Sequence, residues 1–351
     1  MIFCLLVFVG VTNFARAKDN LVLLKSGGWA RGHSEGLRVT EDGCLTLTSN
    51  NHSPGKEGFF ISPSIESEFG FTHLVPFWNA TTPAGTGIGV KAKLKIDDEW
   101  SPWLKIATWN ENKPSTYDTS SPRVETKIDI LAVKSRKADK FKLLIELYSE
   151  NSDNAPTVRL IGATYWNSRE KTQSTKSGVT GYLKDLEVPK ESQFEEPASI
   201  APLICSPTAL SMVLQYYGNR VKPVEVARGV YDNGAEIYGN WPFNTAYAAR
   251  HGLEAYVRYF TSIKGIKDEI AAGRPTVVSL AYEKGELDGS PIESTAGHLV
   301  VVRGFLKKGG QEYVIVNDPA AKTDRSVRRS YRLDQFVSAW KNIGYVMRPL
   351  D

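Results

Sequence analysis

The hydrophobic pattern of this chain changes its period near residue 182, and this change constrains the fold more than any other feature. Before it, apolar and polar residues alternate in short runs, at 44–48, 88–96 and 140–147. Such alternation is typical of half-buried strands, and no convincing helical window appears there. Clusters of Gly, Pro and Asn separate the runs and mark turns. The pattern predicts an antiparallel β-sandwich or jelly roll over residues 18–166.

After residue 182 the pattern predicts helices first and strands second. The predicted helices are 205–217, 223–230, 240–250, 262–272 and 332–340, and the predicted strands are 254–260, 276–282, 298–305, 313–316 and 345–347. This order is typical of an α+β domain, which we expect over residues 182–351. Residues 167–181 are polar and aperiodic, so we expect them to link the two domains.

The first 17 residues have the form of a secretory signal peptide. A short apolar run ends in Ala15-Arg16-Ala17, which is an A-x-A cleavage pattern. We therefore expect a secreted or periplasmic protein, and an uncleaved anchor is the alternative. No later segment is long and apolar enough to cross a membrane.

Cleavage would remove Cys4 and leave Cys44 and Cys205. Two cysteines in a secreted chain can pair, but these two fall in different predicted domains, so we expect two free thiols. The net charge of +4, from 43 basic and 39 acidic residues, is too small to suggest a nucleic-acid partner. No cofactor or metal is expected.

Tryptophans are frequent in the predicted sandwich, and they support two interpretations. They are Trp29, Trp78, Trp100, Trp103, Trp109 and Trp166. Exposed aromatic rings bind sugars in carbohydrate-binding modules, so a glycan is a possible partner of this domain. The favoured interpretation is that they fill the core, as large aromatic residues usually do.

The acidic run 97–99 also supports two interpretations, a calcium-binding loop or a hairpin turn, and the turn is favoured.

Cys205 lies where a predicted helix begins. Ser206 or Thr208 is expected to cap this helix, and Pro207 suits its first turn. Unpaired backbone N–H groups and the helix dipole at this end stabilise a thiolate, so Cys205 is a candidate nucleophile. The alternative is a small buried cysteine.

A cysteine nucleophile needs a base, and a third group that orients the base. His298 opens an apolar strand, and Asp318 follows the next strand. If the two strands form a hairpin, the two side chains become neighbours. The alternatives are a strand-end histidine and an aspartate that initiates a turn. His251 lies at a helix end and is expected to be structural. The backbone N–H of Cys205 and the side chain of Gln193 are candidate oxyanion donors.

These motifs resemble those of the C39-like peptidases in the papain-like superfamily. The chain has Val188-Pro189 before Gln193, then Cys205-Ser206-Pro207-Thr208, then Gly297-His298, and finally Asn317-Asp318-Pro319. The resemblance implies that Cys205 is the nucleophile, His298 the general base, Asp318 the orienting residue and Gln193 the oxyanion donor. The N-terminal half resembles the β-sandwich that precedes this domain in some secreted bacterial relatives, through segments 60–63, 76–80 and 100–103.

The chain departs from the family pattern at two places. Ser206 replaces the more usual glycine, and Gln193 precedes Cys205 by twelve residues (205 − 193), which is long for this superfamily. The resemblance implies a secreted cysteine peptidase that cleaves peptides or proteins through a thioester. One alternative is a transglutaminase-like acyl transferase, although no tryptophan lies between His298 and Asp318. The other is a non-catalytic binding protein with a vestigial triad.

Overall fold

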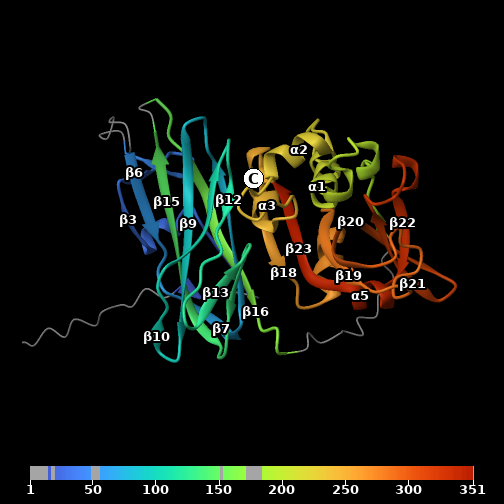
Figure 1. Cartoon of the computed structure of the whole chain (residues 1–351), viewed down its shortest axis with the longest axis horizontal. Coiled ribbons are helices and arrows are strands. Elements are labelled where there is room, and N and C mark those ends of the chain that lie inside the picture. Colours follow the sequence, from blue (N-terminus) through green and yellow to red (C-terminus); the bar gives the residue numbers. More distant parts are fainter. Residues whose placement is uncertain (1–14, 17–19, 49–55, 151–152, 171–183, 351) are drawn as a thin grey trace, which may run out of the picture.

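The computed structural model describes residues 15–16, 20–48, 56–150, 153–170 and 184–350. It consists mostly of strands in three sheets, with few helices (Figure 1). Apart from Ala15 and Arg16, the expected signal peptide lies outside the described residues. Residues 171–181 of the expected linker also lie outside them. Residues 167–170 are ordered against the sandwich, where the backbone N–H of Ser168 donates to Thr72 Oγ1 over 2.9 Å.

Two sheets form a β-sandwich in the N-terminal half. The nine-stranded outer sheet contains β1 (Ala15–Arg16), β3 (His33–Glu35), β6 (Lys56–Ile61), β7 (Ile65–Phe71), β9 (Thr86–Ile96), β10 (Glu99–Trp100), β11 (Leu104–Asn110), β12 (Ser115–Thr116) and β15 (Ala138–Ser149). The seven-stranded inner sheet contains β2 (Leu21–Lys25), β4 (Leu37–Val39), β5 (Leu45–Leu47), β8 (His73–Thr81), β13 (Val124–Lys127), β14 (Ile130–Val133) and β16 (Thr157–Trp166). The alternating runs of the sequence became strands, because their apolar residues face the space between the sheets.

The C-terminal half contains five α-helices and a third sheet. The helices are α1 (Cys205–Tyr216), α2 (Pro223–Val230), α3 (Trp241–Arg250), α4 (Ile263–Ala271) and α5 (Leu333–Ala339). The sheet order is β18 (Leu253–Tyr259), β23 (Trp340–Pro349), β19 (Thr276–Tyr282), β20 (Thr295–Lys308), β21 (Gln311–Asn317) and β22 (Arg328–Arg332), and β17 (Lys184–Asp185) pairs with β20. Each predicted helix and strand is present within a few residues. Strand β22 was not predicted, because four of its five residues are polar and only Tyr331 is fully buried.

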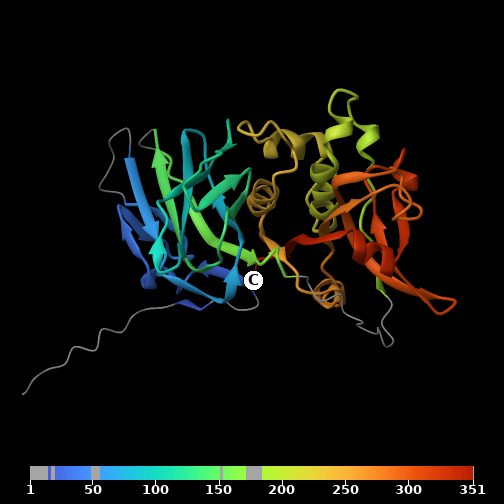
Figure 2. The ribbon, with the colours of Figure 1, turned by 60° about the horizontal axis from the view of Figure 1, so that its bottom comes forward.

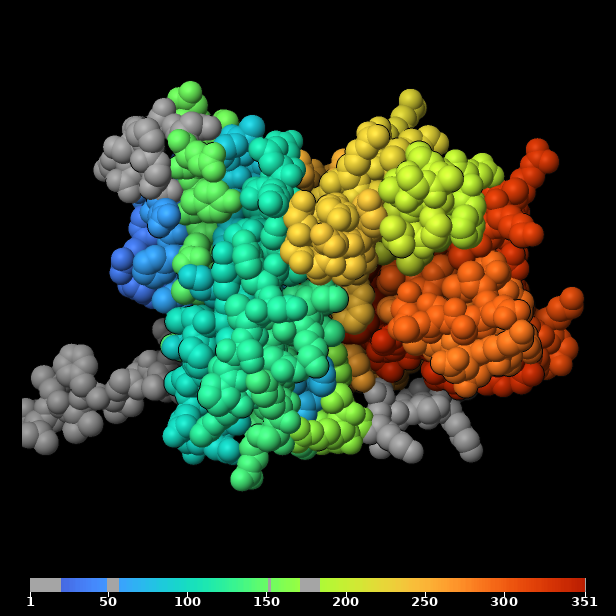
Figure 3. All heavy atoms as spheres, viewed as in Figure 1, coloured from blue at the N-terminus to red at the C-terminus, as the bar shows by residue number. Residues whose placement is uncertain are grey.

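The inner sheet of the sandwich also packs against the C-terminal half. Asn79 on β8 donates from Nδ2 to the Ala255 carbonyl over 2.6 Å and accepts from the Ala255 N–H over 3.2 Å, as a neighbouring strand would. Helix α3 lies between the halves in Figures 1 and 2. Its Phe243 packs edge-on against Trp78 and lies 5.2 Å from Trp109, measured between ring centroids. Figure 3 shows from outside that the two halves touch, where yellow residues meet teal ones.

This packing divides the tryptophans of the sandwich into two groups. Trp29, Trp78 and Trp109 are buried, so the core interpretation is confirmed for these three. Trp100, Trp103 and Trp166 are only half-buried, and Trp100 lies on strand β10 of the outer sheet with Trp103 just before strand β11. Asp97 and Asp98 form the left-handed turn between β9 and β10, as the hairpin interpretation required. Among the described residues, no helix is long and apolar enough to span a membrane.

Candidate active site

Cys205 is the first residue of α1, so its thiol lies at the positive end of the helix dipole. The predicted side-chain cap is wrong, because Ile204 occupies the N-cap position. Ser206 instead points into the core, where its Oγ lies 2.9 Å from both Asn244 Oδ1 and Tyr345 Oη. The serine that replaces the family's usual glycine therefore ties the start of α1 to α3 and β23.

The hairpin of β20 and β21 brings His298 and Asp318 together. The two strands pair antiparallel, with Val302 opposite Val316. His298 Nε2 lies 2.7 Å from Asp318 Oδ1, and the two side chains are 3% and 0% exposed. The predicted hairpin and the predicted contact of these two side chains are both confirmed.

Asp318 is held as a buried carboxylate by three donors. Besides the His298 ring, Tyr331 Oη donates to Asp318 Oδ2 over 2.6 Å, and the Ala320 N–H donates to Oδ1 over 3.0 Å. Burial alone would raise the pKa of Asp318. The charge and hydrogen bond of His298, with those of the other donors, outweigh burial and lower this pKa.

Cys205 and His298 stabilise each other's charged forms. Burial raises the pKa of the Cys205 thiol, but a hydrogen bond and the charge of His298 lower it further than burial raises it. Burial would likewise lower the pKa of His298, whereas Asp318 and Cys205 raise it to about 10. Since Nε2 faces Asp318, Nδ1 is the ring nitrogen left for the thiol. The arrangement therefore favours a thiolate beside an imidazolium.

Gln193 opens the short 3-10 helix η2 (Gln193–Glu195) and is buried. Its Nε2 donates to the carbonyl of Ala201 over 2.9 Å, within η3 (Ala201–Leu203), just before Cys205. Its Oε1 is buried without a hydrogen-bond partner among the described atoms. The side chain is thus anchored next to the segment that carries the nucleophile, and one of its two amide hydrogens is already used.

Asn317 connects the Gln193 segment to the hairpin. Its Nδ2 donates to the carbonyl of Pro189 over 2.8 Å, and its Oδ1 accepts from Arg303 Nη1 over 3.2 Å. The Gln193 N–H donates to the carbonyl of Pro319 over 2.9 Å. The turn that carries Asp318 and the segment that carries Gln193 are therefore fixed to each other. The Asn-Asp-Pro motif was visible in the sequence, but this role of its asparagine was not predicted.

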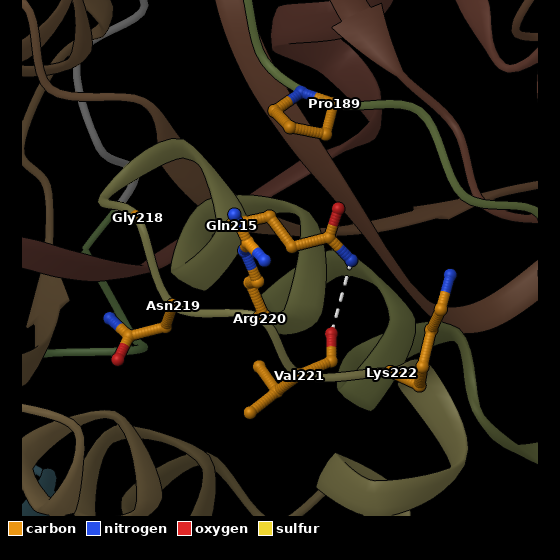
Figure 4. A pocket seen from close by; sticks show the side chains of 7 residues that line it. All are labelled: Pro189, Gln215, Gly218, Asn219, Arg220, Val221 and Lys222. Carbon is orange, nitrogen blue, oxygen red and sulfur yellow. Dashed lines mark hydrogen bonds between the residues drawn. The ribbon is translucent and has the colours of Figure 1, made fainter.

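A hollow of about 550 Å³ lies at the other end of α1 (Figure 4). Its lining consists of Pro189, Gln215, Gly218, Asn219, Arg220, Val221 and Lys222. Gln215 Nε2 donates across it to the carbonyl of Val221 over 3.1 Å. Gln215 follows Cys205 by ten positions along α1, a rise of about 15 Å. The hollow is therefore distinct from the Cys205 site, and its lining contains no cysteine, serine or threonine.

His251 and Cys44 lie outside the Cys205 site. His251 is the C-cap of α3, and its ring lies 4.7 Å from that of Tyr247, measured between centroids. Cys44 is buried in the sandwich, and both Cys44 and Cys205 are free thiols, as predicted. No group of three or more His, Cys, Asp or Glu residues within the described ranges is arranged to hold a metal ion.

The Tyr331 hydroxyl is a partner of Asp318 that the sequence did not reveal. Tyr331→Phe is expected to lower the free energy of unfolding by about 1–3 kcal/mol, because a buried carboxylate oxygen loses its donor. Urea denaturation measures this change, with Tyr313→Phe on β21 as the control. An unfolding free energy equal to that of the wild type would contradict the role of this hydrogen bond.

Two family matches cover most of the chain. Residues 185–347 match the Peptidase_C39 like family, and residues 21–165 match the Peptidase C39 N-terminal domain. A search of curated proteins finds no match.

Solved structures show only distant likeness. The peptidase domain of Streptococcus ComA, a bi-functional ABC transporter, is 16% identical, and the alignment covers 48% of this chain and all of that domain with a TM-score of 0.33. The digestive procathepsin L2 of Tenebrio molitor is 14% identical over 50% of this chain and 70% of its own, with a TM-score of 0.35. TmCBM61, solved with β-1,4-galactotriose, is 8% identical over 42% of this chain and 83% of its own, with a TM-score of 0.22.

The family is therefore assigned from the two family matches. One match covers the N-terminal half of the structure, and the other covers the C-terminal half. Residues 185–347 form a domain of the Peptidase_C39 like family, preceded at residues 21–165 by a Peptidase C39 N-terminal domain.

Proposed function

We propose that this protein is a cysteine peptidase with a papain-like catalytic domain, in which Cys205, His298 and Asp318 form the catalytic triad. The observation that carries the proposal is the buried His298–Asp318 pair, with 2.7 Å between Nε2 and Oδ1, next to a thiol whose pKa is lowered by the same histidine. The pattern of residues 1–17 supports action outside the cytoplasm.

The geometry supports a two-step acyl transfer. The Cys205 thiolate attacks the carbonyl carbon of the peptide bond, and the His298 imidazolium gives its proton to the leaving amine. A thioester to Cys205 remains. The neutral imidazole then takes a proton from water, which attacks the thioester and releases the acid and the thiol. Throughout this cycle Asp318 orients the ring and stabilises its cation.

The developing oxyanion needs donors next to Cys205. Backbone N–H groups in the first turn of a helix have no intrahelical acceptor, so the N–H of Cys205 is the first candidate. The second amide hydrogen of Gln193 is the other candidate. The bond from Gln193 to Ala201 supports this role, because it fixes the amide to the segment that leads into Cys205.

Two exposed apolar residues on the Gln193–Cys205 segment support a peptide substrate. Phe194 is 45% exposed on η2, and Leu203 is 60% exposed on η3, two residues before the nucleophile. Leu203 precedes Cys205 by two residues and Phe194 directly follows Gln193, so an apolar group of a substrate held by these residues can reach them. We propose that they bind an apolar side chain of the substrate.

A library of protein-derived peptides tests the proposed reaction. The wild type and Cys44→Ser are expected to cleave some of its members at the same rate, and Cys205→Ser is expected to be slower by at least about 10³-fold. Mass spectrometry detects both the new termini and the thioester on Cys205. Cleavage that persists in Cys205→Ser, or a wild type that cleaves no more than this variant, would overturn the proposal. Transfer of the acyl group to an added amine, without hydrolysis, would favour the acyl transferase instead.

A further inference from the structure

The outer sheet of the sandwich carries a block of lysines on its solvent-facing side. In the pairing of β9 with β15, Lys93 lies directly opposite Lys142, and Lys95 lies directly opposite Lys140. Leu94 and Phe141, which lie opposite each other between these two pairs, point into the core and are buried. Two successive cross-strand pairs on one face are thus pairs of like charge, an arrangement that destabilises a sheet.

Only part of this charge is neutralised by neighbouring carboxylates. Lys95 binds Asp98 over 2.8 Å, and Lys140 lies 3.7 Å from Glu66. Within the part of the chain that the structure describes, no carboxylate lies within 4.0 Å of the Lys93 or Lys142 ammonium group. Burial lowers the pKa of Lys93, and the charge of Lys142 lowers it further. The fold therefore keeps two adjacent cations without a counter-ion.

Two tryptophans flank these cations. The Lys93 Nζ lies 5.1 Å from the centroid of the Trp100 ring and 4.8 Å from that of Trp103, and the Lys142 Nζ lies 5.7 Å from the Trp100 centroid. Cation–π contacts at exposed sites are weak, so Lys93 can exchange them for a carboxylate of a ligand. The exchange would free the ring faces, whose negative potential attracts the C–H groups of a sugar.

This surface is remote from the proposed catalytic site. The inner sheet packs against the C-terminal half, through contacts such as Asn79 with Ala255, so the outer sheet exposes its other face on the far side of the sandwich. Figure 1 shows β9 and β15 on the side of the sandwich away from α1. A ligand of this face would not touch Cys205.

We propose that this face, defined by Lys93, Lys142, Trp100 and Trp103, binds a glycan that carries carboxylate groups. One carboxylate lies between the two ammonium groups, and adjacent sugar rings pack on the two tryptophans. Further along the same face, Glu146 is 40% exposed beside Lys91, and Tyr148 accepts from Asn110 Nδ2 over 3.1 Å. These polar groups suit the hydroxyls of a sugar.

The same groups disfavour a nucleic acid. A single strand places a phosphate at every nucleotide, and its binding requires a continuous track of cations. Here Glu66, Asp98 and Glu146 interrupt the track, because each lies beside a lysine of this face. A glycan with spaced carboxylates and many hydroxyls matches this alternation of charge.

Calorimetric titration of the full chain tests the proposal. The probes are oligosaccharides of galacturonate, of mannuronate and of hyaluronan, each compared with its methyl ester, and a thymidine 20-mer. At least one uronate is expected to bind. Its methyl ester is expected to bind about tenfold more weakly, and the uronate is expected to lose about the same factor in affinity at high salt. Lys93→Gln, Lys142→Gln and Trp103→Ala are each expected to weaken binding about tenfold. The control Lys127→Gln, on the inner sheet, is expected to bind as the wild type does.

Thermal unfolding of the same variants separates binding from folding. If the lysine pair serves a ligand, Lys142→Gln keeps or raises the melting temperature, because it removes a repulsion. Failure of every uronate to bind, or tighter binding of the thymidine 20-mer than of any uronate, would overturn the proposal. A lowered melting temperature in Lys142→Gln, with uronate binding unchanged, would also overturn it. The alkylation rate of Cys205 is expected to stay unchanged in these variants, so this test is independent of the peptidase proposal.

Discussion

Replacement of His298 by alanine is expected to slow the alkylation of Cys205 by iodoacetamide at pH 6 by roughly 100-fold. A thiol with an ordinary pKa of roughly 8.5 is only about 0.3% thiolate at this pH. Since His298 lowers the pKa of Cys205, most of this advantage disappears with the ring. The expected factor is smaller than the full ratio of the two thiolate fractions because a thiolate of low pKa is a weaker nucleophile. Peptide mass spectrometry after timed quenching gives the rate.

Two internal comparisons make this result specific. Cys44 is buried, and burial together with Asp42 raises its pKa, so it is expected to react slowly in every variant. His251→Ala removes the other histidine of the C-terminal half and is expected to leave the Cys205 rate unchanged. Equal alkylation rates in wild type and His298→Ala would show that the ring does not activate the thiol.

Replacement of Phe243 by alanine is expected to lower the free energy of unfolding by about 3–5 kcal/mol, the usual cost of removing a fully buried phenylalanine. The effect is expected to reach both halves, because this ring packs against Trp78 and Trp109 of the sandwich. Asn244, the next residue of α3, contacts Ser206 beside the nucleophile. Loosening α3 is therefore also expected to disturb the start of α1.

Urea denaturation followed by tryptophan fluorescence and by Cys205 alkylation measures this coupling. Both signals are expected to shift to lower urea together in Phe243→Ala. The exposed Phe194→Ala is expected to change stability by less than about 0.5 kcal/mol. If the alkylation transition moves to lower urea and the tryptophan fluorescence transition does not, the two halves fold independently of this contact.

Much of the fold could be predicted from the sequence because its periodicity is local. The alternation at 88–96 and 140–147 became β9 and β15, and the cysteine-led segment became α1. Strand β22 was not predicted because three of its five residues are arginines and one is a serine. Its backbone pairing with β21, rather than an apolar pattern of its own, makes it a strand. The failed cap at Ser206 has a similar cause, since its partners Asn244 and Tyr345 lie far along the chain.

The part of the candidate site that one hairpin positions could be predicted from the sequence. His298 lies on β20, and Asp318 directly follows β21, which pairs with β20 after a short turn, so the pairing brings the two residues near each other. The partners Tyr331 and Asn317 were not predicted, because a tyrosine or asparagine at these positions has no pattern that marks it as buried beside an acid. The tryptophans show the same limit. Composition alone could not distinguish Trp109, which is buried between the halves, from Trp103, which lies beside Lys93.

The central claim is that Cys205 is a thiolate held by the His298–Asp318 pair near neutral pH. The most direct test is a pH titration of the thiolate by its ultraviolet absorbance, taken as the difference between wild type and Cys205→Ser. We predict an inflection well below the ordinary thiol pKa of roughly 8.5, and we expect it to move to higher pH in His298→Ala. A single inflection at or above roughly 8.5 in the wild type, unchanged in His298→Ala, would contradict it.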